Sequence, residues 1–132
     1  MVVASNEEEG MAPLDVISRY HEALRSGDFE GARGLLRDDL RFVGPFESFD
    51  DADAYLAAVQ KLWTIVRSID VRHVSVSGDE VVALYDMVTE TPAGTQLVCE
   101  WYGLDADSIA WIRALFDTAP FASLREGRSA PG

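Results

Sequence analysis

The spacing of apolar residues changes near Arg67, and this change limits the folds that the chain can adopt. Before Arg67 apolar residues recur at helical spacing, and after it they alternate with polar residues, as in strands with one buried face. Helices followed by consecutive strands predict an α+β domain, in which the helices cover one face of a mostly antiparallel sheet.

Three helices are expected before the change in spacing. They run from Pro13 to Gly27, from Asp28 to Leu36, and from Asp50 or Asp51 to about Val66. Each begins at a residue suited to a helix N-terminus, since proline lacks the N–H that the first turn leaves unpaired and aspartate accepts hydrogen bonds there. A short strand from Leu40 to Val43 is expected between the second helix and the third.

Four strands linked by hairpin turns are expected after the change. Turn residues at 77–79, 91–94 and 105–108 bound strands at about 69–76, 81–91, 96–104 and 109–116. The alternation slips by one residue at Arg72-His73, which predicts a β-bulge. In the third strand the alternation places Glu100 on one face with Val98 and Tyr102, opposite Cys99 and Trp101.

Length and charge exclude several classes of protein. The 132 residues favour a single domain over residues 12–124, with a disordered leader at 1–11 and a disordered tail at 125–132. The formal net charge of −12 and the single lysine, Lys61, argue against nucleic acid and against an anionic membrane surface. The longest stretch without a charged side chain, Thr91 to Cys99, is too short to span a membrane.

The cysteine and histidine residues form no motif that would bind a metal or a cofactor. The lone Cys99 cannot form an intrachain disulfide, and no signal-peptide pattern is present, so a cytoplasmic location is expected. The two histidines lie far apart in sequence, and no metal motif or glycine-rich phosphate loop occurs. Neither a metal nor a cofactor is expected.

Three motifs, in a shared order and spacing, carry a resemblance to a known superfamily. They are Arg19-Tyr20-x-x-Ala23-Leu24-x-x-Gly27-Asp28-Phe29, Leu35-Leu36-x-Asp38-Asp39 and Trp111-Ile112-Arg113-Ala114-Leu115-Phe116-Asp117. Over residues 13 to 117 the chain resembles the nuclear transport factor 2-like superfamily, and within it the SnoaL-like and ketosteroid-isomerase-like branch. The resemblance implies a cone, in which a curved sheet wraps round a long helix and encloses an apolar cavity.

The resemblance also implies two catalytic residues. Tyr20 falls where a first-helix tyrosine of ketosteroid isomerases donates a hydrogen bond to the substrate oxygen, and Glu100 aligns with their protonated aspartic acid. The structural alternatives stay open, since a helix tyrosine can simply fill the core and a strand carboxylate can be solvated or paired with an arginine.

The position of the isomerases' general base departs from the family pattern. Those enzymes place an aspartate immediately before a proline at the end of the first strand, where this chain has Gly44-Pro45. Because glycine cannot move a proton, the usual steroid-isomerase mechanism is not expected. His21 has the pKa range for proton transfer, and Glu100 is a second candidate base; a buried structural role for His21 remains the alternative.

Side chains from several elements are expected to line the cavity of the implied cone. They are His21, Phe42, Tyr55, Trp63, Tyr85, Met87, Val98, Tyr102, Ile112 and Phe116. Trp101 and Trp111 would lie on the outer sheet face, where a homodimer partner could cover them.

The expected function is the binding of a small apolar molecule with a polar end. If the chain is an enzyme, the reaction is cofactor-free isomerisation, cyclisation or dehydration, with Tyr20 and Glu100 as hydrogen-bond donors or as the proton-transfer pair. The alternative is a non-catalytic ligand-binding or dimerisation module of the same fold, which has lost the general base at Gly44.

Overall fold

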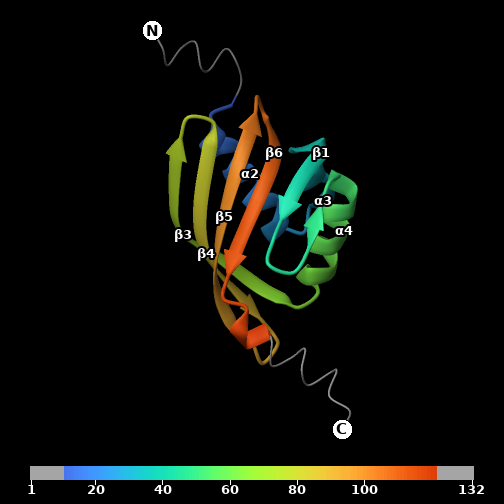
Figure 1. The fold of residues 1–132 in the computed structure, drawn as a ribbon, viewed down its shortest axis with the longest axis vertical. Helices are drawn as coiled ribbons and strands as arrows, with labels where there is room; N and C mark the ends of the chain where they lie inside the picture. The colour runs from blue at the N-terminus through green and yellow to red at the C-terminus, as the bar shows by residue number, and fades with distance from the viewer. Residues whose placement is uncertain (1–10, 122–132) are drawn as a thin grey trace.

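A computed structural model of the chain describes residues 11–121 (Figure 1). Its helices are α2 (Pro13–Arg25), α3 (Phe29–Arg33) and α4 (Ala52–Trp63), and its strands are β1 (Leu36–Val43), β2 (Ser48–Phe49), β3 (Val66–Ser77), β4 (Glu80–Thr89), β5 (Thr95–Asp105) and β6 (Ser108–Phe116). Apart from Met11, the predicted leader and tail lie outside the described residues. Within the described range no helix is long and apolar enough to cross a membrane.

The strands form one six-stranded sheet in the order β2-β1-β6-β5-β4-β3. Strands β3 to β6 pair antiparallel with their neighbours in sequence, whereas β1 pairs parallel with β6. In Figure 1 the sheet curves and α2 crosses behind it. The α+β class, the mostly antiparallel sheet and the helices on one of its faces are therefore confirmed.

The boundary between α3 and β1 differs from the prediction. Helix α3 ends at Arg33, and Leu36 already belongs to β1, where it pairs with Ile109 of β6. The prediction that Leu35 and Leu36 continue the helix is wrong because the Leu35 carbonyl accepts the Ile109 N–H, at 2.8 Å, and commits the backbone to the sheet. Strand β1 is correspondingly longer than the predicted Leu40–Val43.

Helix α4 begins at the second of the two aspartates proposed to cap it. The Asp51 carboxylate accepts a hydrogen bond from the Ala54 N–H at 2.7 Å, which satisfies one of the unpaired donors of the first turn. The helix ends at Trp63, earlier than the predicted Val66, because Val66 pairs with Thr89 as the first residue of β3.

The predicted bulge in β3 is confirmed. The pairing between β3 and β4 shifts by one residue between Val71 and His73. A bulge bends its strand and increases the local twist, so this irregularity contributes to the curvature of the sheet around α2.

The inner face of the sheet and one face of α2 form the core. Helix α2 buries its apolar stripe, and on β5 the alternation holds from Thr95 to Tyr102, with Gln96, Val98, Glu100 and Tyr102 buried. On the opposite face Leu97 and Trp101 are exposed. Glu100 therefore points into the cone, and it shares a face with Val98 and Tyr102, as the alternation predicted.

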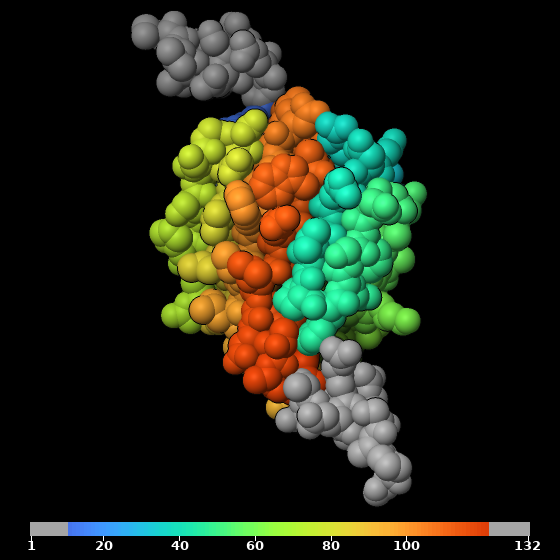
Figure 2. Space-filling view, in the orientation of Figure 1, coloured from blue at the N-terminus to red at the C-terminus, as the bar shows by residue number. Residues whose placement is uncertain are grey.

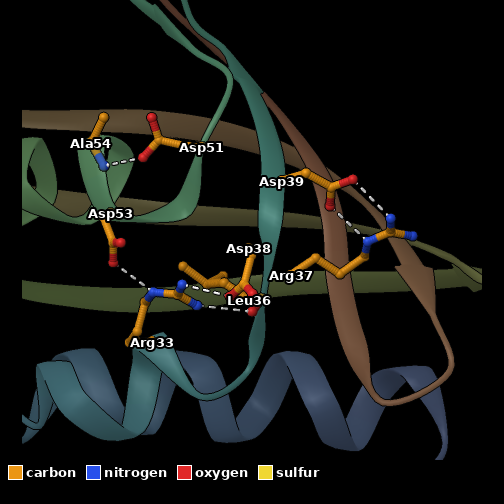
Figure 3. A network of polar contacts seen from close by, with 8 residues as sticks. All are labelled: Arg33, Leu36, Arg37, Asp38, Asp39, Asp51, Asp53 and Ala54. Atoms are coloured by element: carbon orange, nitrogen blue, oxygen red, sulfur yellow. Dashed lines mark hydrogen bonds and ion pairs between the residues drawn. The ribbon is translucent and has the colours of Figure 1, made fainter.

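A polar cluster ties both shorter helices to the start of β1 (Figure 3). The Arg33 guanidinium donates to Asp53 on α4 at 2.8 Å, to Asp38 on β1 at 2.7 Å and to the Leu36 carbonyl at 3.2 Å. Both carboxylates are exposed, so each ion pair contributes at most about 1 kcal/mol. The contribution of the cluster is to orient α3 and α4 against β1.

Candidate functional site

An inner cavity of about 100 Å³ lies between α2, α4 and the concave face of the sheet. Its wall is mainly apolar, and its polar groups come from three tyrosines, one histidine and one glutamate. The lining residues are Tyr20, His21, Leu24, Phe42, Tyr55, Val59, Leu62, Trp63, Ile69, Tyr85, Met87, Val98, Glu100, Ala114 and Phe116.

A larger outer cavity of about 310 Å³ adjoins the inner one, since Phe42, Tyr55, Val59, Leu62, Met87 and Phe116 line both. The residues that line only the outer cavity are Gly44, Pro45, Phe46, Glu47, Phe49, Ala58, Ile65 and Phe121. The rings of Phe46, Phe116 and Phe121 contact one another there, with centroids 5.4 to 5.9 Å apart. The polar groups are thus concentrated in the inner cavity and the outer one is almost wholly apolar.

Two tyrosine hydroxyls meet at the inner cavity. Tyr20 on α2 and Tyr55 on α4 form a hydrogen bond of 2.5 Å between their hydroxyl oxygens. Each hydroxyl carries one proton, and the bond uses one of the two. No other described residue hydrogen-bonds this pair, so one proton remains for donation into the cavity. Burial, and then the charge of Glu100, raise the pKa of Tyr20 well above its usual range, so it keeps its proton.

Glu100 faces the same cavity from β5. Its carboxylate accepts a hydrogen bond of 2.5 Å from the Tyr102 hydroxyl, two residues along the same strand face, and a second from the Tyr85 hydroxyl on β4. No arginine among residues 11–121 forms an ion pair with it. Burial raises the pKa of the Glu100 carboxyl, and the hydrogen bonds from Tyr102 and Tyr85 act in the opposite direction.

His21 follows Tyr20 on α2 and lines the same cavity as Glu100. Its Nε2 is 2.9 Å from the Tyr102 hydroxyl, and its ring packs edge-on against Tyr85 and Tyr102. Burial and the nearby Arg25 guanidinium lower the pKa of His21 to about 4. The imidazole is therefore neutral near neutral pH.

The structure brings most of the predicted site residues together. Tyr20 and Glu100 line the inner cavity with eight residues of the predicted wall, namely His21, Phe42, Tyr55, Trp63, Tyr85, Met87, Val98 and Phe116. The side chains of Tyr102 and Ile112 are completely buried outside that wall, and Tyr102 reaches the site only through its hydroxyl.

Sequence reasoning missed parts of the wall. Val59 and Leu62 follow Tyr55 at helical spacing, so this pattern could have placed them beside it. Phe121 closes part of the outer cavity from beyond the last strand, where no periodic pattern indicates the direction of a side chain.

Gly44 occupies a crowded position at the outer cavity. A Cβ atom there would lie 2.9 Å from two ring atoms of Phe42. The Phe42 ring therefore takes up space that any larger residue at position 44 would need. Within the described part of the chain, no group of three histidine, cysteine, aspartate or glutamate residues is arranged to hold a metal ion.

The outer face of the sheet carries a separate groove of about 660 Å³, lined by Arg41, Val43, Trp101, Trp111, Ile112 and Arg113. Figure 2 shows this face, with β6 running between β5 and β1. The indole rings of Trp101 and Trp111 contact edge-to-face, with centroids 5.1 Å apart. Trp101 is 39% exposed, as the outward-facing prediction required.

Solved structures share this fold. A protein from Kribbella flavida DSM 17836 is 25% identical, with a TM-score of 0.79 over 87% of this chain and 94% of its own. An NTF2-like protein of unknown function from Cytophaga hutchinsonii ATCC 33406 is 20% identical, with a TM-score of 0.75 over 85% and 96%. An M. tuberculosis LEH-like epoxide hydrolase is 19% identical, with a TM-score of 0.70 over 89% and 92%.

No curated protein matches the sequence. The family of the SnoaL-like domain does match it, over residues 17–112, which run from the first turns of α2 into β6. This range covers most of the chain and contains Tyr20, Tyr55 and Glu100. The fold confirms the nuclear transport factor 2-like resemblance, and the chain belongs to the SnoaL-like domain family.

Proposed function

We propose that this protein binds a small, largely apolar molecule with a carbonyl or similar polar end, and moves a proton on it without a cofactor. One observation carries the proposal. A hydroxyl pair with a proton to donate, Tyr20 and Tyr55, and a buried carboxylate, Glu100, line the same cavity. The inner cavity accommodates the polar end, and the outer cavity of about 310 Å³ accommodates the apolar body.

Glu100 acts as the base in this proposal. The hydroxyls of Tyr102 and Tyr85 both donate to its carboxylate, and such hydrogen bonds favour the charged, proton-accepting form. Burial raises its pKa above the ordinary glutamate value, toward the range in which a base is most effective near neutral pH. This assignment replaces the missing aspartate at Gly44 with a residue on a different strand.

The Tyr20–Tyr55 pair stabilises the negative charge that forms during the reaction. Glu100 removes a proton from the carbon next to the carbonyl, and the electron pair of that C–H bond moves onto the carbonyl oxygen as an enolate. The remaining tyrosine proton hydrogen-bonds this oxygen, an interaction that strengthens as charge develops. In an isomerisation, Glu100 returns the proton to a different carbon. In a cyclisation, the enolate carbon attacks a second carbonyl carbon, and the resulting alkoxide takes the proton from Glu100.

A two-stage experiment tests binding and proton transfer separately. Apolar ketones, phenols and lactones are first screened by thermal shift against the full chain. The ketones that stabilise it are then incubated with the protein in D₂O, and NMR measures deuterium incorporation next to the carbonyl. We expect Glu100→Gln to retain binding and to lose exchange activity by about 10² to 10⁴-fold, and Tyr20→Phe to weaken both binding and exchange.

Matched variants make the result decisive. Glu30→Gln changes an exposed carboxylate on α3 that lines neither cavity, and it should leave the exchange rate unchanged. Equal stabilisation of wild type, Tyr20→Phe and Glu100→Gln by every compound would reject the inner cavity as the binding site. Exchange that persists in Glu100→Gln would reject Glu100 as the base.

The crowding at Gly44 favours a second candidate function, that of a binding module without catalysis. The Phe42 ring lies against the position where the isomerases of this superfamily carry their base. Under this alternative the screen finds stabilising compounds, but wild type exchanges no deuterium above the rate in buffer. The same experiment therefore separates the two functions.

We further propose that the outer sheet face forms a homodimer. The Trp101–Trp111 groove is flanked by exposed apolar side chains, since Leu97 is 56% and Leu115 66% exposed. Isolated proteins seldom expose apolar groups in such a contiguous patch. Light scattering after size-exclusion chromatography should give a dimer for wild type and a monomer for Leu115→Glu. Val76→Glu, which alters an exposed apolar residue of β3 outside the groove, should remain dimeric.

A further inference from the structure

A continuous chain of buried hydrogen bonds links Glu100 to His21 through Tyr102, which lies outside the wall of the inner cavity. The Tyr102 hydroxyl lies 2.5 Å from Glu100 Oε1 on one side and 2.9 Å from His21 Nε2 on the other. Tyr102 is fully buried, and Glu100 and His21 are at most 9% exposed. The chain joins β5 to α2 and involves no residue of the Tyr20–Tyr55 pair.

The direction of each hydrogen bond fixes the position of the proton on His21. The Tyr102 hydroxyl has one proton, and it donates this proton to Glu100. Its oxygen can then only accept a proton from His21, so Nε2 carries the hydrogen. Because His21 is neutral near neutral pH, Nδ1 carries none.

Protonation of Glu100 permits the opposite pattern. The carboxylic acid can donate to the Tyr102 oxygen, and the Tyr102 proton then points to His21. Nε2 must accept this bond with its lone pair, so the hydrogen of the neutral imidazole resides on Nδ1. Each charge state of Glu100 thus corresponds to one tautomer of His21.

We propose that Tyr102 and His21 are positioning residues that hold Glu100 as a proton acceptor, and that the His21 tautomer changes when Glu100 takes up a proton. The proposal rests on the proposed function only in naming Glu100 as the acid–base group. A hydrogen-bond chain of this kind lets Tyr102 orient the ionised Glu100 carboxylate. When Glu100 takes up a proton and loses its charge, the hydrogen bonds reverse direction, and Tyr102 and His21 both keep a partner.

The groups that surround this chain of hydrogen bonds keep their own protonation state while Glu100 changes its charge. Glu100 faces the phenols of Tyr85 on β4, Tyr20 on α2 and Tyr55 on α4, and burial keeps all of these protonated by raising their pKa values well above the usual range. The Tyr102 phenol behaves in the same way.

Near His21 the charged group is Arg25, one helical turn along α2, which together with burial lowers the pKa of the imidazole to about 4. Above that pH, Glu100 is the member of the chain that changes charge.

Nitrogen-15 NMR of the histidine side chains tests the proposal without a ligand. The two ring nitrogens of a neutral histidine differ in chemical shift according to which of them is protonated. From about pH 8 to about pH 4.5, wild-type His21 should pass from the Nε2–H to the Nδ1–H tautomer. The midpoint should equal that of the Glu100 carboxyl, followed by carbon-13 NMR. His73, which bonds Ser75 at an exposed position, serves as the internal reference.

Two variants distinguish coupling from structural support. Tyr102→Phe retains the ring and removes the hydroxyl, so the Glu100 midpoint should rise and the His21 tautomer should no longer follow it. Glu100→Gln should make the His21 tautomer independent of pH. Amide spectra and melting temperatures of both variants confirm that they are folded.

A His21 that holds the Nδ1–H tautomer at high pH, or that keeps one tautomer through the Glu100 midpoint, would overturn the proposal. An unchanged Glu100 midpoint in folded Tyr102→Phe would also overturn it. These results do not depend on catalysis: a protein that shows the coupling but exchanges no deuterium would retain this inference and lose the proposed function.

Discussion

Glu100 is a costly residue to place inside a protein. Its side chain lies in a largely apolar cavity without a cationic partner among the described residues, and two phenol hydroxyls only partly replace the water that a carboxylate loses on burial. A group that is maintained at this expense near a proton donor is typical of acid–base sites.

The pH dependence of stability provides the first prediction. The pKa of Glu100 is higher in the folded protein than in the unfolded chain. Its contribution to stability is therefore complete below the unfolded pKa and is lost as pH rises through the folded pKa. At pH 8, Glu100→Gln should have a higher free energy of unfolding than wild type, by about 1.4 kcal/mol for each unit of difference between the folded and unfolded pKa values. This difference between variant and wild type should approach zero near pH 4.

Urea unfolding at several pH values measures this difference. A Glu100→Gln protein that is less stable than wild type at pH 8 would show that the carboxylate stabilises the fold.

At the scale of single residues, strand alternation was sufficient to place Glu100 on one face of β5 with Val98 and Tyr102, because successive side chains of a strand point to opposite faces. It did not decide whether that face is buried inside the cone or solvated. It did not reveal the bond from Tyr102. Two residues on one strand face are neighbours, but whether their polar atoms meet depends on rotamers set by the packing of β4 and α2. The Tyr20–Tyr55 bond likewise depends on the position of α4, which no local pattern specifies.

At the scale of elements, the N-terminus of α4 gives a second prediction. Asp50 and Asp51 are equally good capping residues by type, and the structure selects Asp51. Asp51→Ala should lower the free energy of unfolding by about 1 kcal/mol, measured by urea titration. Asp50→Ala, at the neighbouring exposed position, should change it by less than about 0.5 kcal/mol. The reverse order would assign the cap to Asp50.

Gly103 in β5 gives a third prediction, because the Trp111 indole lies directly over it. A Cβ atom at this position would come within 2.1 Å of Trp111 Cε2 and Nε1. Gly103→Ala should therefore displace the indole, cost about 1 to 3 kcal/mol of stability, and change the near-UV circular dichroism of the Trp101–Trp111 pair.

The matched control is Gly34→Ala at the end of α3. Its added Cβ would meet only ordinary contacts, the nearest at 3.5 Å, so the free energy of unfolding should shift by less than about 0.5 kcal/mol. A Gly103→Ala protein with wild-type dichroism would contradict the predicted displacement.

The elements most predictable from sequence were the hairpin-linked strands. Their apolar residues alternate over most of each strand, their turns contain glycine or aspartate, and even the bulge near His73 left a one-residue slip in the pattern. The start of β1 was not predictable in this way. Leu35 and Leu36 suit the apolar face of a helix as well as a strand, and the bond that decides between them comes from Ile109, more than seventy positions away.

At the scale of the whole molecule, charge opposes the proposed dimer. Each subunit carries a formal net charge of −12, so two subunits repel one another at low ionic strength. Added salt screens this repulsion. We expect the dimer dissociation constant, measured by analytical ultracentrifugation, to fall as sodium chloride increases from low to moderate concentration. A constant that rises with salt would indicate attractive ion pairs across the interface instead of the apolar contact.

The parallel pairing of β1 with β6 has a kinetic consequence. β1 is complete by residue 43, but apart from the two-residue β2 its strand partner is β6, which begins at residue 108. During synthesis one edge of β1 therefore stays unpaired until β6 has left the ribosome. Pairing across so long a loop is slow compared with hairpin formation. In pulsed hydrogen exchange during refolding, the amides of β4 and β5 should gain protection before those of β1, so closure of the cone around the inner cavity would be the final event of folding.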